Sequence, residues 1–309
     1  MSSKIESKSD HMLHKAAANG HLESLKNILD SGRVHVDCAD EEGTTALMLA
    51  CSNGHLECAK LLIEEGADVC AQRQTGTHAL GFAAQNGNLN ILDLLLSSGA
   101  KVDQQNKDGG TALFVAAQCG KLMAVQFLAK NGADVDCAMK DGATALFVAA
   151  QNGHLPVVRF LLSKNACVNK PRQDGATPLW IASQMGHTAA IKELLNNGAN
   201  VNSAREDGAT PIFKAAHKGH DGVVDALLES KPDLSLCKNG ESALHAACLF
   251  GHLNVVQSLV TAGADPFLKN KCGETPEELA HQIGYDDIVD YLKKFEKPVK
   301  LMPMHSTDL

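Results

Sequence analysis

Aromatic residues are scarce in this chain. They make up 4% of its 309 residues, and Trp180 is the single tryptophan. Alanine, leucine and glycine are plentiful instead. This composition favours thin, closely packed layers, each buried against its neighbours, over one large core.

Long apolar runs and basic clusters are also missing. The sequence has no stretch of about 18 apolar residues, and the first residues, MSSKIESKSDHM, lack the apolar segment of a signal peptide. The net charge is −8 and no block of Lys or Arg stands out, which argues against a nucleic-acid partner. We therefore expect an intracellular, cytoplasmic protein that neither inserts into membranes nor binds nucleic acid.

Motifs of catalysis and of disulfide scaffolds do not occur. The ten cysteines form no C-x-x-C pair, so reduced thiols are expected. Neither G-x-x-x-x-G-K-[ST] nor G-x-S-x-G is found, and we predict no enzyme and no cofactor. Among 14 histidines, His217 and His220 lie close together, and a metal site or active site there is the alternative hypothesis. No carboxylate or thiol stands near them at a spacing typical of zinc.

What the sequence does contain is a repeat. The stretch TALFVAAQCGK at 111–121 returns almost unchanged as TALFVAAQNGH at 144–154, 33 residues later. One row of glycines follows the same period of 32 to 34 residues, and its members are Gly20, Gly54, Gly87, Gly120, Gly153, Gly186, Gly219, Gly251 and Gly284. Such a period indicates a stack of similar units.

The sequence of each repeat predicts a helix, a turn and a second helix. In DGATALFVAAQNGHLPVVRFLLSKNACVN, two short apolar patterns of helical spacing are separated by a break that contains glycine. Thr144 can cap the first helix, and Pro156 can begin the second. Asp-Gly pairs, such as Asp141 with Gly142, predict tight turns between units.

The pattern resembles the ankyrin repeat. It is met closely in TPLWIASQMGH with GANVN and in SALHAACLFGH with GADP. The resemblance implies an all-α ankyrin-repeat solenoid of nine helix-turn-helix repeats with β-hairpin-like tips, capped at both ends. We expect this domain over residues 10–297, between a disordered N-terminus at 1–9 and a disordered tail at 298–309.

The resemblance also implies a non-enzymatic function. We expect an interaction module or adaptor that binds a protein partner on a concave face lined by hairpin tips and first helices. Family positions give a candidate partner-binding set, which comprises Phe114, Phe147, Trp180, Phe213, Gln118, Gln151, Gln184, Met139, Lys140, Arg172 and Arg205. The histidines in the Gly-His positions, such as His154 and His187, are expected to tie turns together by hydrogen bonds.

Two rows within this set have alternative interpretations. Phe114, Phe147, Trp180 and Phe213 stand where the family usually has histidine; their rings either pack between repeats or form an exposed stripe that anchors a partner. The glutamines either bond one another along the stack, which we favour, or meet a partner's backbone.

Two further hypotheses concern the end of the chain and two asparagines. The final Ser-Thr-Asp-Leu, with Thr307 and Leu309, resembles a ligand of a PDZ domain, which predicts a structural tether as the alternative function. Asn169 and Asn202 stand in NACVN and GANVN, where the family resemblance implies possible substrates of an asparaginyl hydroxylase.

Overall fold

A computed structural model describes residues 7–295, and in this part of the chain every regular element is a helix. The one β-type contact there is an isolated bridge between Ala39 and Thr45. The helices come in pairs and fall into two compact units, Met1–Asn200 and Val201–Leu309. The all-α ankyrin-type fold class predicted from the sequence is confirmed.

The first unit contains twelve described helices. They are α1 Lys8–Asn19, α2 Leu22–Asp30, α3 Ala46–Asn53, α4 Leu56–Glu64, α5 Ala79–Asn86, α6 Leu89–Ser97, α7 Ala112–Gln118, α8 Leu122–Lys130, α9 Ala145–Gln151, α10 Leu155–Ser163, α11 Pro178–Met185 and α12 Thr188–Asn196. The second unit has six: α13 Pro211–Lys218, α14 Asp221–Leu228, α15 Ala243–Leu249, α16 Leu253–Thr261, α17 Pro276–Ile283 and α18 Asp286–Leu292.

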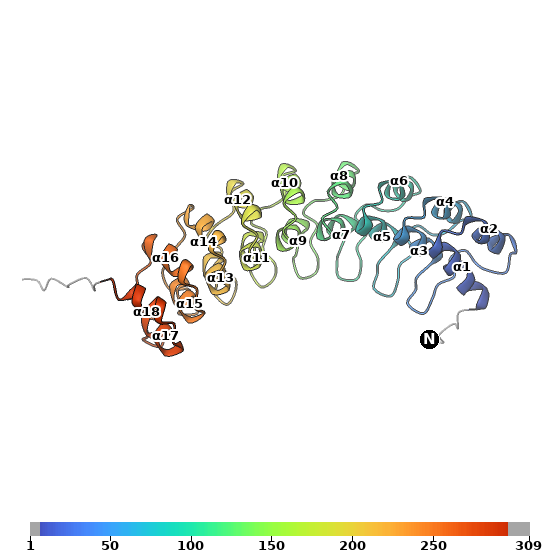
Figure 1. The fold of residues 1–309 in the computed structure, drawn as a ribbon. Coiled ribbons are helices and arrows are strands. Elements are labelled where there is room, and N and C mark those ends of the chain that lie inside the picture. The colour runs from blue at the N-terminus through green and yellow to red at the C-terminus, as the bar shows by residue number, and fades with distance from the viewer. Residues whose placement is uncertain (1–6, 296–309) are drawn as a thin grey trace, which may run out of the picture. The chain divides into compact units, whose positions relative to one another are not determined.

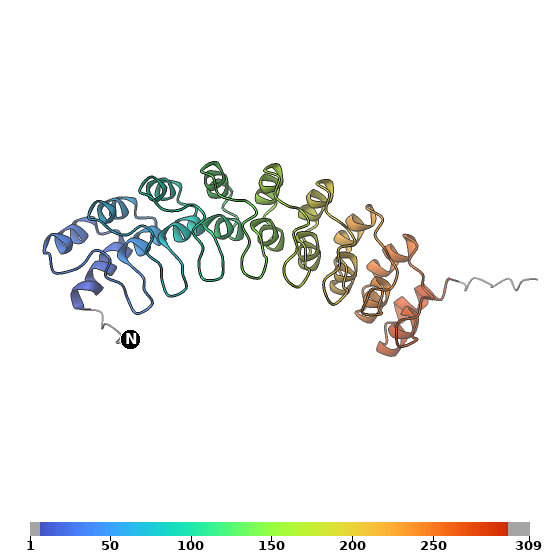
Figure 2. The same cartoon turned by 180° about the vertical axis from the view of Figure 1, so that it is seen from behind.

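Within each unit the helices form two layers. In the first unit, the odd-numbered helices α1 to α11 pack side by side, and the even-numbered helices α2 to α12 form the second layer (Figures 1 and 2). In the second unit, α13, α15 and α17 make one layer and α14, α16 and α18 the other. We call the odd-numbered helices the first helices, because each opens its repeat.

Local sequence signals set where the first helices begin. Thr144 Oγ1 accepts a hydrogen bond from the Phe147 N–H (3.2 Å), and so caps α9 as predicted. Pro178 occupies the first position of α11, where its missing N–H costs nothing, and Pro156 lies in the first turn of α10. The N-terminal helix starts at Lys8 because Ser7 and Asp10 form a capping box, so the boundary expected at residue 10 falls inside this helix.

Small residues let the first helices approach closely. Ala149 and Ala150 are fully buried, as are most members of the equivalent pairs in other repeats. Leu146 is likewise fully buried. Burial of this kind in every repeat replaces the single large core that the composition disfavours.

Histidines join several repeats to the repeats before them. His154 Nε2 donates to the carbonyl oxygen of Gln118, and His187 Nε2 to that of Gln151, each at 3.0 Å. Gly153 must be glycine for two reasons: its φ is +71°, and a Cβ there would lie 2.6 Å from His187 Nδ1. The structural role predicted for these histidines is confirmed.

The hairpins between repeats are also joined in series. Met139 N–H donates to Ala143 O (2.9 Å) within one hairpin, and Lys140 N–H donates to Asp108 O (2.7 Å) in the preceding one. No helix between residues 7 and 295 combines the length and the apolar character that a membrane span requires.

Candidate functional site on the first helices

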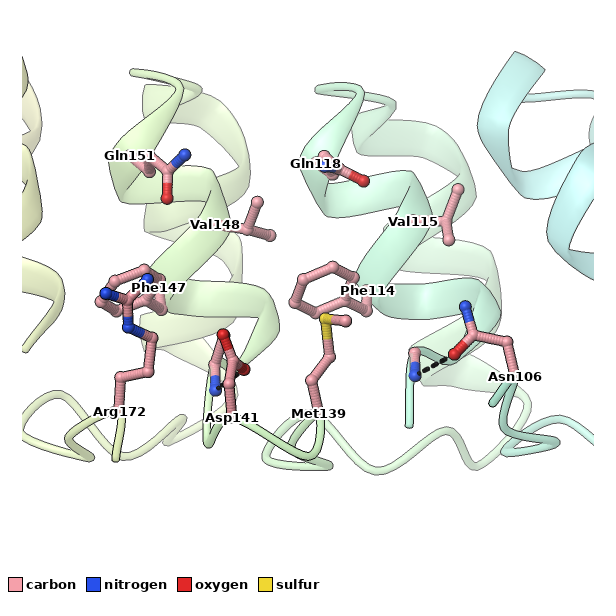
Figure 3. Close-up of a pocket in the computed structure, with 12 residues that line it drawn as sticks. Asn106, Phe114, Val115, Gln118, Met139, Asp141, Phe147, Val148, Gln151 and Arg172 are labelled. Atoms are coloured by element: carbon pink, nitrogen blue, oxygen red, sulfur yellow. Dashed lines mark hydrogen bonds between the residues drawn. The ribbon is translucent and has the colours of Figure 1, made fainter. Parts of the chain in front are cut away.

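A pocket of about 230 Å³ lies between α7 and α9 and above the hairpins that precede them (Figure 3). Two successive repeats supply matching residues to it, 33 positions apart. Its lining comprises Asn106, Gly110, Phe114, Val115, Gln118, Met139, Asp141, Ala143, Phe147, Val148, Gln151 and Arg172. Six members of the predicted partner-binding set therefore meet here.

The aromatic row is packed into the protein. The exposed fraction is 7% for Phe114 and 2% for both Phe147 and Trp180, all in the first unit. Phe213, in the second unit, is 8% exposed. These values favour packing over an exposed stripe, although Phe114 and Phe147 still contribute to the floor of the pocket.

Arg172 closes one side of the pocket over the Phe147 ring. Its guanidinium carbon lies 5.4 Å from the ring centroid, within the range of a cation–π contact. The side chain is also held by Asp174, with Nε–Oδ1 at 3.0 Å and Nη2–Oδ2 at 2.6 Å. These hydrogen bonds raise the pKa of Arg172, so its charge is fixed and its orientation is set before any partner arrives.

The glutamine side chains of the pocket are not bonded to each other. Gln118 is exposed and Gln151 half-buried, and their main-chain carbonyls accept the histidine bonds described above. Within residues 7–295, neither side-chain amide makes a hydrogen bond. The pairing of glutamines that we favoured from the sequence is therefore wrong for this pair, because the inter-repeat bonds run through the backbone carbonyls.

Several residues of the pocket were not anticipated. Val115 and Val148 lie on the helices, whereas Asn106 and Asp141 lie in the hairpins. Asn106 Oδ1 accepts from Gly110 N–H (2.8 Å) and Asp141 Oδ1 from Ala143 N–H (2.9 Å). In the sequence, each of these four residues either adjoins a predicted residue or stands one repeat period away from one. The repeat register could therefore have identified them.

The remaining predicted residues lie elsewhere. Lys140 is exposed at a hairpin tip, and Gln184 is half-buried at the end of α11. Arg205, in the second unit, lies 3.7 Å from Asp207, measured from Nη1 to Oδ2. None of the three lines the pocket.

The histidine pair in the second unit has a structural setting. The His217 ring packs against Phe250 with centroids 4.3 Å apart, and the His217 carbonyl accepts from His252 Nε2 (3.3 Å). Burial, and then the charges of Lys214 and Lys218, lower the pKa of His217. Across the described range, no group of three or more His, Cys, Asp or Glu side chains could hold a metal ion.

Asn169 and Asn202 are exposed but hydrogen-bonded between repeats. Asn169 Oδ1 accepts from Asn200 N–H (2.8 Å) and its Nδ2 donates to Gly198 O (3.0 Å), while Asn202 Oδ1 accepts from Asp233 N–H (2.9 Å). Their hydroxylation stays a prediction, which intact-mass analysis after co-expression with a hydroxylase would test. Thr307 and Leu309 lie outside the described residues.

Comparison with known families agrees with this geometry. Models described as "Ankyrin repeats (3 copies)" match residues 13–106, 80–172 and 167–236, and one described as "Ankyrin repeats (many copies)" matches residues 231–280. The chain belongs to the ankyrin-repeat family. Ankyrin repeats form protein–protein interaction modules that are generally non-enzymatic, so a protein partner is indicated.

Curated relatives match shorter stretches. Ankyrin repeat domain-containing protein 29 is 48% identical over 69 residues in Homo sapiens, or 22% of each chain. In Danio rerio it is 50% identical over 74 residues, or 24% of this chain and 25% of that protein. Protein phosphatase 1 regulatory subunit 27 of Homo sapiens is 44% identical over 54 residues, or 18% of this chain and 35% of that protein. The matches thus span about a fifth to a third of these relatives.

Proposed function

We propose that this ankyrin-repeat chain is a non-enzymatic adaptor that binds a protein partner on the face formed by its first helices and hairpins, the concave face of the family. The observation that carries the proposal is the pocket between α7 and α9. It combines an apolar floor with two glutamine amides that have no partner within the described residues.

The chemistry of the pocket suits one side chain of an extended protein segment. Phe114, Met139 and the valines offer apolar contact, while the amides of Gln118 and Gln151 can bond the main chain of a segment crossing above them. Pockets for drug-sized ligands generally enclose about 300 to 1,000 Å³. The smaller volume here favours a protein side chain over a small molecule.

The setting of Arg172 supports the same proposal. Because Asp174 and the Phe147 ring already hold the guanidinium, little side-chain entropy is lost when a partner packs against it. Ordered polar groups around an apolar floor are typical of the buried centre of a protein interface. The proposal also includes a cytoplasmic location, which the free thiols of all ten cysteines favour.

The test begins with proximity labelling of the full chain to identify a partner, followed by quantitative binding. We expect Val115→Lys, and the double change Gln118→Ala with Gln151→Ala, to weaken binding about tenfold or more, as substitutions at the centre of an interface do. Met123→Lys is the matched control, because Met123 is 60% exposed on α8 in the other layer. Equal binding by all variants would contradict the proposal.

A further inference from the structure

The second unit carries a different surface on its first helices. Leu249 and Phe250 at the end of α15 are 38% and 44% exposed, and Ile283 at the end of α17 is 54% exposed. The helices α15 and α17 pack side by side, so these side chains belong to neighbouring repeats of one layer. We call this set the apolar patch.

The patch departs from the repeat pattern. When residues are counted from the N-cap of each first helix, Leu249 and Phe250 in the repeat of α15 correspond to Gln151 and Asn152 in the repeat of α9. The repeat of α9 packs into the stack with polar residues at these positions. Since the stack does not require exposed apolar groups there, an aromatic and an aliphatic side chain call for another explanation.

Positive charge adjoins the patch on α13. The helix sequence PIFKAAHK contains Lys214, His217 and Lys218, spaced to lie on one face, and no acidic residue. Lys214 stands where α9 has Val148. The next helix, α14, carries Asp221 and Asp225 in the other layer, while Glu206 and Asp207 lie in the hairpin before α13.

The two features are physically joined. The His217 ring contacts the Phe250 ring at 4.3 Å, and its buried Nδ1 has no hydrogen-bond partner among the described residues. Burial, and then the charges of Lys218 and Arg205, lower the pKa of Lys214, against the opposing effect of Asp207. An approaching carboxylate would offset the repulsion among these cations.

We propose that the apolar patch and the cations of α13 together bind an acidic segment of a partner protein that also carries an aromatic or aliphatic anchor. The anchor packs on Phe250 and Leu249, and the flanking carboxylates pair with Lys214 and Lys218. The positive charge of α13, opposite in sign to the net charge of −8, favours acidic partners by complementarity. This surface is separate from the pocket between α7 and α9, so the inference goes beyond the proposed function.

The experiment is a selection of displayed random peptides on the full chain, followed by affinity measurement of the enriched peptides. We expect enrichment of sequences with several Asp or Glu around a Phe, Trp or Leu, and affinities that fall as salt rises, because exposed charges are screened. The double change Lys214→Gln with Lys218→Gln, and separately Phe250→Ala, should each weaken these peptides about tenfold.

Matched controls come from the same unit. Lys293→Gln with Lys294→Gln removes two exposed cations near α18, and Phe295→Ala removes an aromatic residue that is 38% exposed; both should leave the affinity unchanged. Selection of no acidic peptides, or selected acidic peptides that the α13 and Phe250 variants do not affect, would overturn the inference. So would capture of anionic lipid vesicles that depends on the lysines and not on Phe250.

The outcome is separable from that of the proposed function. Peptides that bind at the pocket of the first unit respond to Val115→Lys and not to the α13 variants. Circular dichroism of each variant establishes that it is folded, and Lys218→Glu, at an exposed position, adds a reversal test. This variant should lose acidic peptides without loss of structure.

Discussion

At the scale of single residues, His78 shows how one departure from the repeat changes the physics. It stands where most other repeats have a capping threonine. Its Nδ1 accepts from Gly81 N–H (3.2 Å) and its Nε2 donates to Gln104 O (2.9 Å). The ring is 2% exposed. A protonated ring could not accept the Gly81 N–H, so the neutral form is the one that fits.

This setting predicts a pH dependence of stability. Burial lowers the pKa of His78 below its ordinary 6.5, against the opposing hydrogen bond to Gln104. The unfolded chain then binds a proton before the folded chain does, so stability is complete above about pH 6.5 and falls as the pH drops from there toward the folded pKa. His78→Thr keeps a capping oxygen and removes the titration, so urea unfolding between pH 5 and 8 should show a smaller loss on the acid side. An unchanged slope would contradict this account.

Phe147 and Phe250 separate packing from exposure. Phe147, on α9, is 2% exposed, and Phe250, the residue that follows α15, is 44% exposed. Phe147→Ala should lower the free energy of unfolding by about 3 to 5 kcal/mol through the cavity it leaves. Phe250→Ala should change it by less than about 1 kcal/mol. Denaturant titrations of both variants check this, and similar losses would show that the ring at Phe250 is packed as well.

At the scale of elements, the contact between a turn glycine and the next repeat's histidine should be measurable. Gly153→Ala introduces a residue at φ +71° and a Cβ 2.6 Å from His187 Nδ1, whereas Gly132→Ala introduces one at φ +89° with nothing within 4 Å. The left-handed backbone alone costs about 1 to 2 kcal/mol in each case. Gly153→Ala should therefore lower the unfolding midpoint more than Gly132→Ala; equal effects would mean that His187 moves aside freely.

The helices could be predicted from the sequence because their signals are local. Thr144, Pro156 and Gly153 act within one turn of their own positions, and the period of 33 residues multiplies the signal. The start of α1 at Lys8 was missed because Ser7 and Asp10 form a capping box outside the repeat pattern.

The candidate site could be predicted only in part. The register correctly grouped Phe114, Phe147, Gln118 and Gln151, because residues one period apart occupy equivalent places. It could not reveal that the rings are buried or that the glutamine amides stay apart. Those outcomes depend on contacts between repeats, such as Arg172 over Phe147 and His187 to the Gln151 carbonyl.

At the scale of the whole molecule, the two compact units offer two unlike surfaces. The first unit presents a small apolar pocket with polar edges, and the second an apolar patch beside positive charge. Because contacts between neighbouring repeats supply most of the stability of a repeat protein, surface residues in one unit can change without destabilising the other unit. Two surfaces on one chain are what an adaptor requires.

The most direct test of the central claim, that a protein partner binds the face of the first helices, is site-specific photo-cross-linking. A photoreactive amino acid replaces Gln118 in one version of the full chain and Met123 in another, so that the probes lie on opposite layers of neighbouring helices. We predict that position 118 gives a cross-linked partner band, that an excess of unlabelled chain reduces this band, and that position 123 gives no such band. Cross-linking from position 123 alone would contradict the account.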